Sequence, residues 1–283
     1  MKRSLCVLLG TVGMACAGAQ AQSYYTGFEL PNYNASAAGT SVTGQENWYV
    51  PVVGSSNGNV HTYAGNTYGF VQNPVGGNQF LSSASQGGTA FARSQIDIPF
   101  APTQYTVAYD FAGQFVNGTP PSALNLSSFS LNHPTLGAGA FRGFISLNNF
   151  VDVNNPSAGI KTEFNVFNAA GTATNNQSPG AAWTNLDYNH WYRQYVTFDL
   201  ASNLISQITL VDLHTGDSTT ATPQGWYLDG GANSTLPLPA SLRFFGGGNI
   251  GNVTGWDNIS VIPTPGTLAL FGAAGLLASR RRR

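Results

Sequence analysis

The sequence predicts an all-β protein in which two antiparallel sheets pack face to face. Short stretches of alternating apolar and polar residues recur along the chain, which is the pattern of half-buried strands. Clusters of Gly, Asn, Pro and Ser separate these stretches, and no part of residues 22–262 sustains a helical period. Many short strands without crossover helices favour a sandwich, and the lack of an internal repeat argues against a propeller or a β-helix.

Before these strands, residues 1–21 have the layout of a secretory signal peptide. Lys2 and Arg3 precede an apolar run over residues 5–17, and the small residues Ala19 and Ala21 favour cleavage by signal peptidase after Ala21. The exported body then begins at residue 22.

Both cysteines, Cys6 and Cys16, lie inside this signal. The mature chain therefore has no disulfide, no thiolate metal ligand and no cysteine nucleophile. A lipoprotein signal ending at Cys16 is the alternative, but Gly13 and Met14 fit such a signal poorly.

The exported body is acidic. Residues 22–279 contain five Lys and Arg and all 12 acidic residues, a net charge of −7, although the whole chain has a formal charge of −1. Such a surface disfavours nucleic acid and anionic lipid as partners. The length, about 240 residues, suits one large β domain over residues 22–261.

The predicted strands of this domain follow from period-two alternation. Ile96, Ile98 and Phe100 share one face of the first clear strand, and Tyr109 and Phe111 share one face of the second. Strands are predicted at residues 91–100, 105–111, 140–148, 160–167, 191–200, 204–213, 241–245 and 256–261.

Residues 262–283 combine three features. Pro263, Thr264 and Pro265 break regular structure, because proline lacks an N–H and restricts the residue before it. An uncharged apolar run occupies residues 266–279. As a helix it would reach about 21 Å, against roughly 30 Å for the hydrocarbon core, so we expect a short transmembrane helix that is no durable anchor. By the positive-inside rule the cytoplasmic end holds Arg280, Arg281, Arg282 and Arg283.

This layout resembles the PEP-CTERM sorting signal of bacterial surface proteins, in which Pro-Glu-Pro precedes a short apolar helix and an Arg cluster. Here Thr264 stands in place of the Glu. The resemblance implies that an exosortase-like membrane protease cleaves near Pro263 to Pro265. The body would be anchored transiently in the inner membrane and then released or attached to the cell envelope or extracellular matrix. The alternatives are an ordinary tail anchor and a buried core helix.

The two ends of the body carry a second resemblance. Gly27-Phe28-Glu29 and residues 255–261 look like the opening and closing strands of the concanavalin-like (LamG-like) jelly rolls found in PEP-CTERM proteins, and residues 190–216 are similar to a hairpin of that fold. The resemblance implies an antiparallel jelly-roll β-sandwich and says little about a ligand.

Motifs for catalysis and cofactor binding occur in the wrong context. Residues 54–58 match Gly-x-Ser-x-Gly with His61 nearby, but no helix follows, so we expect a turn. Residues 246–251 match Gly-x-Gly-x-x-Gly, but a strand follows, so we expect a hairpin loop. The four histidines are scattered and indicate no zinc site.

A glycosidase needs a pair of carboxylates, and the sequence offers no evident pair. Asp97, Asp110 and Asp199 are single acids on otherwise uncharged strands. We therefore expect no enzymatic activity.

Calcium binding is a more plausible hypothesis. Glu29 near the first strand could meet Asp257 and Asn258 at the last strand, since the ends of a sandwich often lie close together, and hard oxygen ligands suit a structural Ca²⁺. The alternative is that Asp257 caps a turn while Glu29 faces water.

Loop-borne aromatic residues suggest carbohydrate binding. Trp183 and Trp226 each lie beside Pro and Gly, and an exposed indole can stack on a sugar, although most aromatic residues of a sandwich pack in its core. The sequence thus predicts an exported surface or matrix protein with a structural or adhesive role. The alternative is a carbohydrate-binding module with an extracellular polysaccharide as its partner.

Overall fold

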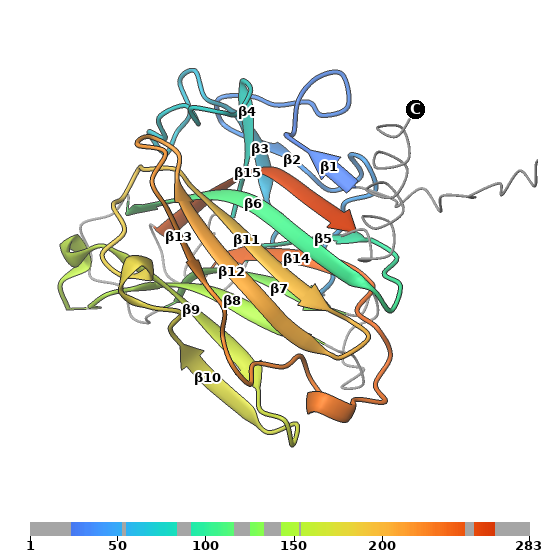
Figure 1. Cartoon of the computed structure of the whole chain (residues 1–283). Helices are drawn as coiled ribbons and strands as arrows, with labels where there is room; N and C mark the ends of the chain where they lie inside the picture. The colour runs from blue at the N-terminus through green and yellow to red at the C-terminus, as the bar shows by residue number, and fades with distance from the viewer. Residues whose placement is uncertain are drawn as a thin grey trace, which may run out of the picture.

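Fifteen strands in two antiparallel sheets make up the computed structural model, which describes residues 24–52, 55–83, 92–115, 125–132, 143–152, 154–246 and 252–263 (Figure 1). The helices of these residues are single 3-10 turns: η1 (Pro156–Ala158), η2 (Ala181–Trp183) and η3 (Gly231–Asn233). The predicted all-β sandwich is confirmed. The predicted signal peptide and apolar tail lie outside the described residues.

The larger sheet has nine strands. In spatial order they are β13 (Ser218–Ala221), β12 (Leu204–Asp212), β11 (Tyr192–Asp199), β6 (Gln104–Phe115), β15 (Asn252–Pro263), β4 (Gln79–Ser82), β3 (Asn59–Thr62) and β2 (Thr40–Ser41), with β1 (Tyr24–Thr26) also paired to β15.

The smaller sheet has six strands. They are β10 (Ala173–Gln177), β9 (Ile160–Phe167), β8 (Phe144–Phe150), β7 (Asn125–Asn132), β14 (Ser241–Gly246) and β5 (Arg93–Asp97). The chain passes repeatedly between the sheets, as in a jelly roll.

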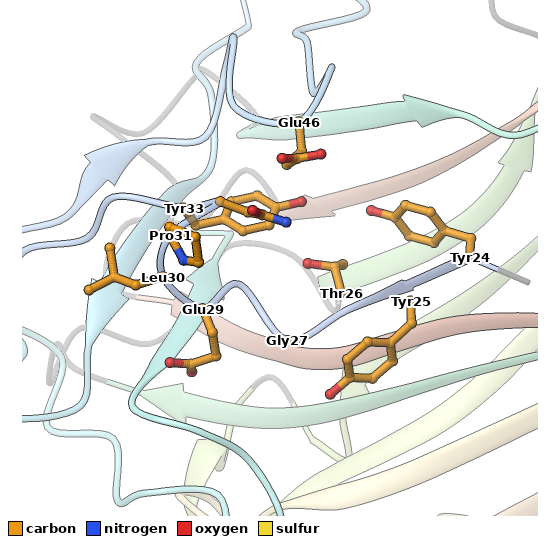
Figure 2. A pocket seen from close by; sticks show the side chains of 10 residues that line it. Tyr24, Tyr25, Thr26, Gly27, Glu29, Leu30, Pro31, Tyr33 and Glu46 are labelled. Carbon is orange, nitrogen blue, oxygen red and sulfur yellow. The ribbon is translucent and has the colours of Figure 1, made fainter.

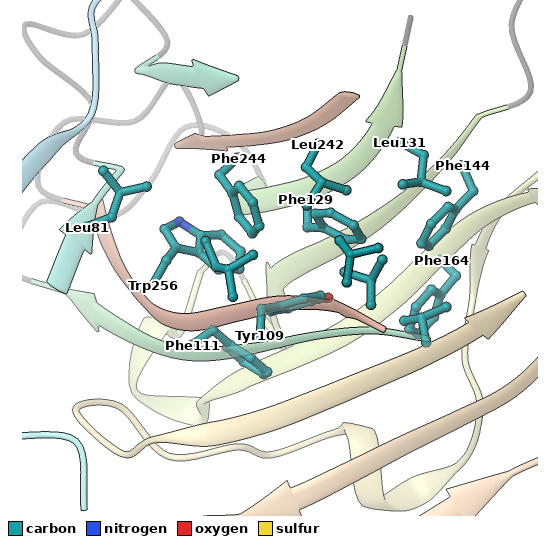
Figure 3. Close-up of a cluster of buried hydrophobic side chains, with 14 of the residues drawn as sticks. Leu81, Tyr109, Phe111, Phe129, Leu131, Phe144, Phe164, Leu242, Phe244 and Trp256 are labelled. Carbon is teal, nitrogen blue, oxygen red and sulfur yellow. The ribbon is translucent and has the colours of Figure 1, made fainter. Parts of the chain in front are cut away.

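The core between the sheets follows from the alternation along each strand. On β6, Tyr109 and Phe111 point inward, and Tyr109 lies 4.8 Å from Phe129 of β7. Phe244 of β14 packs against Trp256 of β15 with ring centroids 5.0 Å apart (Figure 3). The intervening residues of β6, including Asp110, therefore point to the outer face of the larger sheet.

The loop predicted at residues 246–251 is not a hairpin. β14 belongs to the smaller sheet and β15 to the larger one, so this connection crosses between sheets. The predicted hairpin of the 190–216 segment is present, because β11 pairs antiparallel with β12.

β15 lies inside the larger sheet and is bordered on both sides. β6 pairs along one side, while the other side pairs first with β4 and then with β1. The register with β6 shifts between Asp257 and Ser260, where Asn258 adopts φ 46°. Asn tolerates this left-handed conformation, and the bulge directs both Asp257 and Asn258 to the outer face. The strand ends at Pro263, two residues past the predicted end of the domain.

Candidate functional site

Three ionisable side chains form a row across the outer face of the larger sheet. Arg193 of β11 is the cross-strand partner of Asp110 on β6, and Asp110 is the partner of Asp257 on β15. Both carboxylates are 0% exposed. Along the sequence Asp110 is a single acid on its strand, but the sheet register places a second acid directly opposite it.

Hydrogen bonds hold this row in place. Arg193 donates from Nε to Asp110 Oδ1 at 2.5 Å and from Nη2 to Oδ2 at 2.8 Å. Asn73 Nδ2 donates to Asp110 Oδ2 at 2.8 Å and to Asp257 Oδ2 at 3.2 Å. Asn258 Nδ2 donates to Asp110 Oδ2 at 2.8 Å. We call these five residues the carboxylate cluster.

The charges of the carboxylate cluster do not balance if both acids ionise. One guanidinium faces two buried carboxyl groups, and an unpaired buried charge is costly. Burial raises the pKa of Asp257 to about 8, and the charge of Asp110 adds to the increase despite hydrogen bonds from Asn258, Tyr63 and Asn73. The bidentate contact with Asp110 raises the pKa of Arg193. Burial and the neighbouring Asp110 thus both favour the protonated form of Asp257 near neutral pH.

A loop covers both the carboxylate cluster and a neighbouring cluster of aromatic and apolar side chains. Residues 63–78, which we call the cover loop, join β3 to β4. Within it, Asn73 contacts both acids, and Tyr63 donates to Asp257 Oδ2 at 3.1 Å. Beside them Trp191 donates from Nε1 to the carbonyl of Val71 at 2.8 Å. This aromatic cluster consists of Tyr63, Phe70, Phe80, Ala112, Trp191 and Val253.

An open hollow of about 310 Å³ lies next to the carboxylate cluster on the same face. Ala108 and Ser260 line it together with Tyr25, Val75 and Ile262, which are 66%, 52% and 46% exposed. The remaining lining residues are Arg193, Tyr195 and Asn258. The Tyr25 hydroxyl donates to Asn258 Oδ1 at 2.7 Å, which links the hollow to the carboxylate cluster.

A second hollow, of about 210 Å³, lies on the other side of β1 (Figure 2). Tyr24, Tyr33, Asn32, Glu29 and Glu46 are among its lining residues. Figure 2 shows Tyr24 and Tyr25 pointing to opposite sides of the strand, with Glu46 on the same side as Tyr24. This hollow combines aromatic rings with polar side chains.

Two of the predicted calcium ligands, Asp257 and Glu29, lie against the dipeptide Gly76-Gly77 of the cover loop. A Cβ on Gly76 would clash with Asp257 Oδ2, and one on Gly77 would clash with Glu29 Oε1. However, Glu29 Oε1 accepts from the backbone N–H groups of Asn78 and Gln79, at 2.7 and 2.9 Å.

The oxygens of Asp257 likewise face N–H and O–H donors, an arrangement that suits a carboxyl group and does not fit a cation. Asn73 cannot turn its oxygen inward without losing the bond from Val75 N to its Oδ1. Among the described residues no three His, Cys, Asp or Glu side chains are grouped to hold a metal.

The two predicted sugar-stacking tryptophans pack in or against the hydrophobic core. Trp183 in η2 is 1% exposed and offers no ring face to a ligand. Trp226 is half-buried and packs on Phe164, with centroids 5.7 Å apart. A loop position beside Pro and Gly therefore did not indicate exposure.

Histidine and serine do not form a nucleophile site where the motif suggested one. His61 is buried, and its Nε2 lies 2.9 Å from Ser82 Oγ instead of contacting Ser56. His190 and His214 stack at 4.0 Å beside Asp212. Burial and the nearby His190 lower the pKa of His214, so this pair disfavours a second positive charge.

The sorting residues Thr264, Pro265 and Arg280 to Arg283, and the signal residues Ala19 and Ala21, lie outside the described residues. Pro263 is the last residue of β15. Among the residues described, no helix has the length and apolar character needed to cross a bilayer.

No protein-family model and no curated protein matches the sequence. Among solved structures, the chain is similar to lectin II from Ulex europaeus, with 12% identity, a TM-score of 0.47 and coverage of 86% of this chain and 99% of that one. It is also similar to lectin I from Ulex europaeus in complex with the methyl glycoside of α-L-fucose, with 13% identity, a TM-score of 0.47 and coverage of 86% and 98%.

A third similar structure is a carbohydrate esterase, vb_24B_21, from the Shiga toxin-encoding bacteriophage phi24B. It has 13% identity, a TM-score of 0.44 and coverage of 81% of this chain and 98% of that one. We draw no function from resemblances this distant.

Proposed function

We propose that the chain is an exported bacterial cell-surface or extracellular-matrix protein. Its β-sandwich has a structural or adhesive role, and its C-terminal segment directs sorting by an exosortase-like enzyme. One observation supports this proposal: β1 pairs with the end of β15, with Tyr24 opposite Val261. The two segments proposed for removal therefore join the domain beside each other.

Processing at either end leaves the sandwich complete. Signal cleavage after Ala21 falls before β1 begins, and cleavage near Pro263 to Pro265 falls at or after the end of β15. No buried strand is removed by either cut. The domain thus suits a cargo that carries one export signal and one sorting signal.

The intact mass of the protein recovered from the cell envelope tests this proposal. We expect a species that begins at Gln22 and ends near Pro265. A matched variant with Arg280 to Arg283 replaced by Gln should be missorted and keep its tail. Recovery of unaltered protein that still ends at Arg283 would instead indicate a plain tail anchor.

A second candidate function is carbohydrate binding in the hollow of Figure 2. The observation that favours it is the combination of the partly exposed Tyr24 ring with the exposed side chains of Asn32 and Glu46, since aromatic rings stack on sugars, amides donate and accept hydrogen bonds, and carboxylates accept them.

A glycan array with Glu46→Gln would test this function, because Glu46 is exposed and its replacement should preserve the fold. Trp226→Ala is the control, because Trp226 is not among the residues that line this hollow. Equal glycan binding by Glu46→Gln and the parent would exclude this hollow as the sugar-binding site.

A further inference from the structure

Five large apolar side chains of the described residues are exposed, and four of them line two neighbouring hollows. The five are Tyr25, Leu30, Val71, Val75 and Ile262. Three of them, Tyr25, Val75 and Ile262, line the same hollow, and Tyr25 and Leu30 line the neighbouring one. We call Tyr25, Val75 and Ile262 the exit patch, because it surrounds the end of β15, where the chain leaves the sandwich.

We propose that the exit patch rests on the membrane interface while the C-terminal segment is inserted in the bilayer. This inference depends on the proposed sorting function. It adds an orientation: the end of the sandwich with β1 and the end of β15 faces the lipid.

The short segment between β15 and the apolar run supports the membrane as the partner of the exit patch. Pro263 ends β15, and the apolar run begins at Gly266, so the intervening residues span at most about 10 Å. Lipid headgroups add about 5–8 Å to each side of the hydrocarbon core. When the run is inserted, Ile262 therefore lies at or just above the headgroups, and the adjoining side chains of the patch are held beside them.

The chemistry of the exit patch suits a weak, uncharged contact. Tyrosine is favoured at the membrane interface because its ring is apolar and its hydroxyl is polar. The one charged residue lining this hollow, Arg193, is paired with Asp110 and adds no net attraction to anionic lipid. The body as a whole carries −7, which opposes binding to an anionic surface.

Such a contact would form only while the domain is tethered. Three partly exposed side chains cannot hold a soluble domain on a bilayer, but a tether of a few residues gives them a high effective concentration at the surface. The contact would also keep Pro263 to Pro265 at the membrane plane, within reach of a membrane-embedded protease. Cleavage would then release the patch together with the domain.

Fluorescence quenching in vesicles tests the orientation. Residues 22–283 contain no cysteine, so Val75→Cys can carry an NBD label in the full mature chain, reconstituted with phosphatidylcholine and a headgroup-nitroxide lipid. The matched control is Thr219→Cys on β13, an exposed position four strands from β15, or about 19 Å. We expect blue-shifted, quenched emission from position 75 and neither change at position 219.

Two further variants separate the patch from the tail. Leu268→Arg with Leu270→Arg should abolish both flotation with the vesicles and quenching at position 75. Ile262→Ser should reduce the quenching but keep the flotation, with an unchanged melting temperature.

Flotation without quenching at position 75, or with equal quenching at both positions, would overturn the proposed orientation and leave the sorting proposal standing. If the parent chain fails to float, the inserted tail itself is refuted, and the membrane contact that depends on it is refuted as well.

Discussion

The cover loop is fastened to the outer face of the larger sheet by two neighbouring clusters of opposite character. The aromatic cluster holds it by packing around Trp191, which is 0% exposed. The carboxylate cluster holds it through Asn73 and Tyr63, both bonded to Asp257. Strands β6 and β15 contribute residues to both clusters, so neighbouring positions on one face of the sheet carry either apolar or ionisable side chains.

The two clusters that attach the cover loop should respond to different conditions. Apolar packing depends on buried area and on filling space, and changes little with pH. A buried acid pair depends on the number of protons it holds. We therefore expect substitutions in the two clusters to differ in their pH dependence as well as in their size.

The largest effect should come from Trp191→Ala. Removing this side chain leaves a cavity under the cover loop and the carbonyl of Val71 without its donor, so we expect a loss of about 4 kcal/mol in the free energy of unfolding. Chemical unfolding at pH 5 and at pH 9 should give the same loss. Trp226→Ala, at a half-buried position, is the control and should cost less.

Arg193→Leu should have the next largest effect. It leaves Asp110 buried without its guanidinium, which costs about 3–5 kcal/mol for a fully buried pair, and we expect about 3 because the Arg193 side chain is 24% exposed. Thermal unfolding measures this loss. The double variant with Asp110→Leu should recover part of it, and a single variant as stable as the parent would contradict the cost assigned to this pair.

Asp257→Asn should stay within about 1 kcal/mol of the parent at pH 4, because the folded parent carries a protonated Asp257 there, and a protonated acid and an amide are similar in shape and charge. What distinguishes this variant from the parent is how its free energy of unfolding depends on pH. The pKa of Asp257 is about 8 in the folded protein, against about 3.9 for an unfolded Asp.

The folded state therefore binds the extra proton. The contribution of Asp257 is complete below the unfolded pKa and is lost as pH rises through the folded pKa, with a slope of at most about 1.4 kcal/mol per pH unit. Unfolding free energies between pH 4 and pH 9 should show this decline in the parent and not in Asp257→Asn. If the curves of the parent and the variant ran parallel, the proton would not be bound at Asp257.

The smallest effect should come from a chelator. Because the oxygens of Asp257 and Glu29 accept N–H and O–H donors, we expect EDTA to shift the melting temperature by less than about 1 °C. A larger decrease that added Ca²⁺ reverses would restore the predicted calcium site and would require the cover loop to rearrange around Asn73.

The strands that the sequence predicted are those whose environment alternates. Ile160–Phe167 and Tyr192–Asp199 alternate strictly between buried and half-buried residues, and both were located within a residue or two. β7, Asn125–Asn132, was missed because its serines are buried on both faces and resemble a polar loop. β10 and β13 were missed because they are mostly exposed edge strands.

The candidate site was harder to predict than the fold. Asp110 lies on the outward phase of a predicted strand, and Asp257 lies in another predicted strand, but their meeting depends on the register between β6 and β15. Alternation along one strand says nothing about which strand lies beside it. Asn73 comes from a loop with no periodicity, so the sequence carried no signal for its role.

The position of β15 inside the larger sheet also bears on mechanics. A load applied through the C-terminal segment would pull along a strand of 12 residues that is flanked on both sides. Its ladder bonds run across the direction of pull, so many of them must yield together in shear, and pairing on both sides gives β15 more of these bonds than an edge strand would have. A domain held at its C-terminal end would thus resist tension at that end.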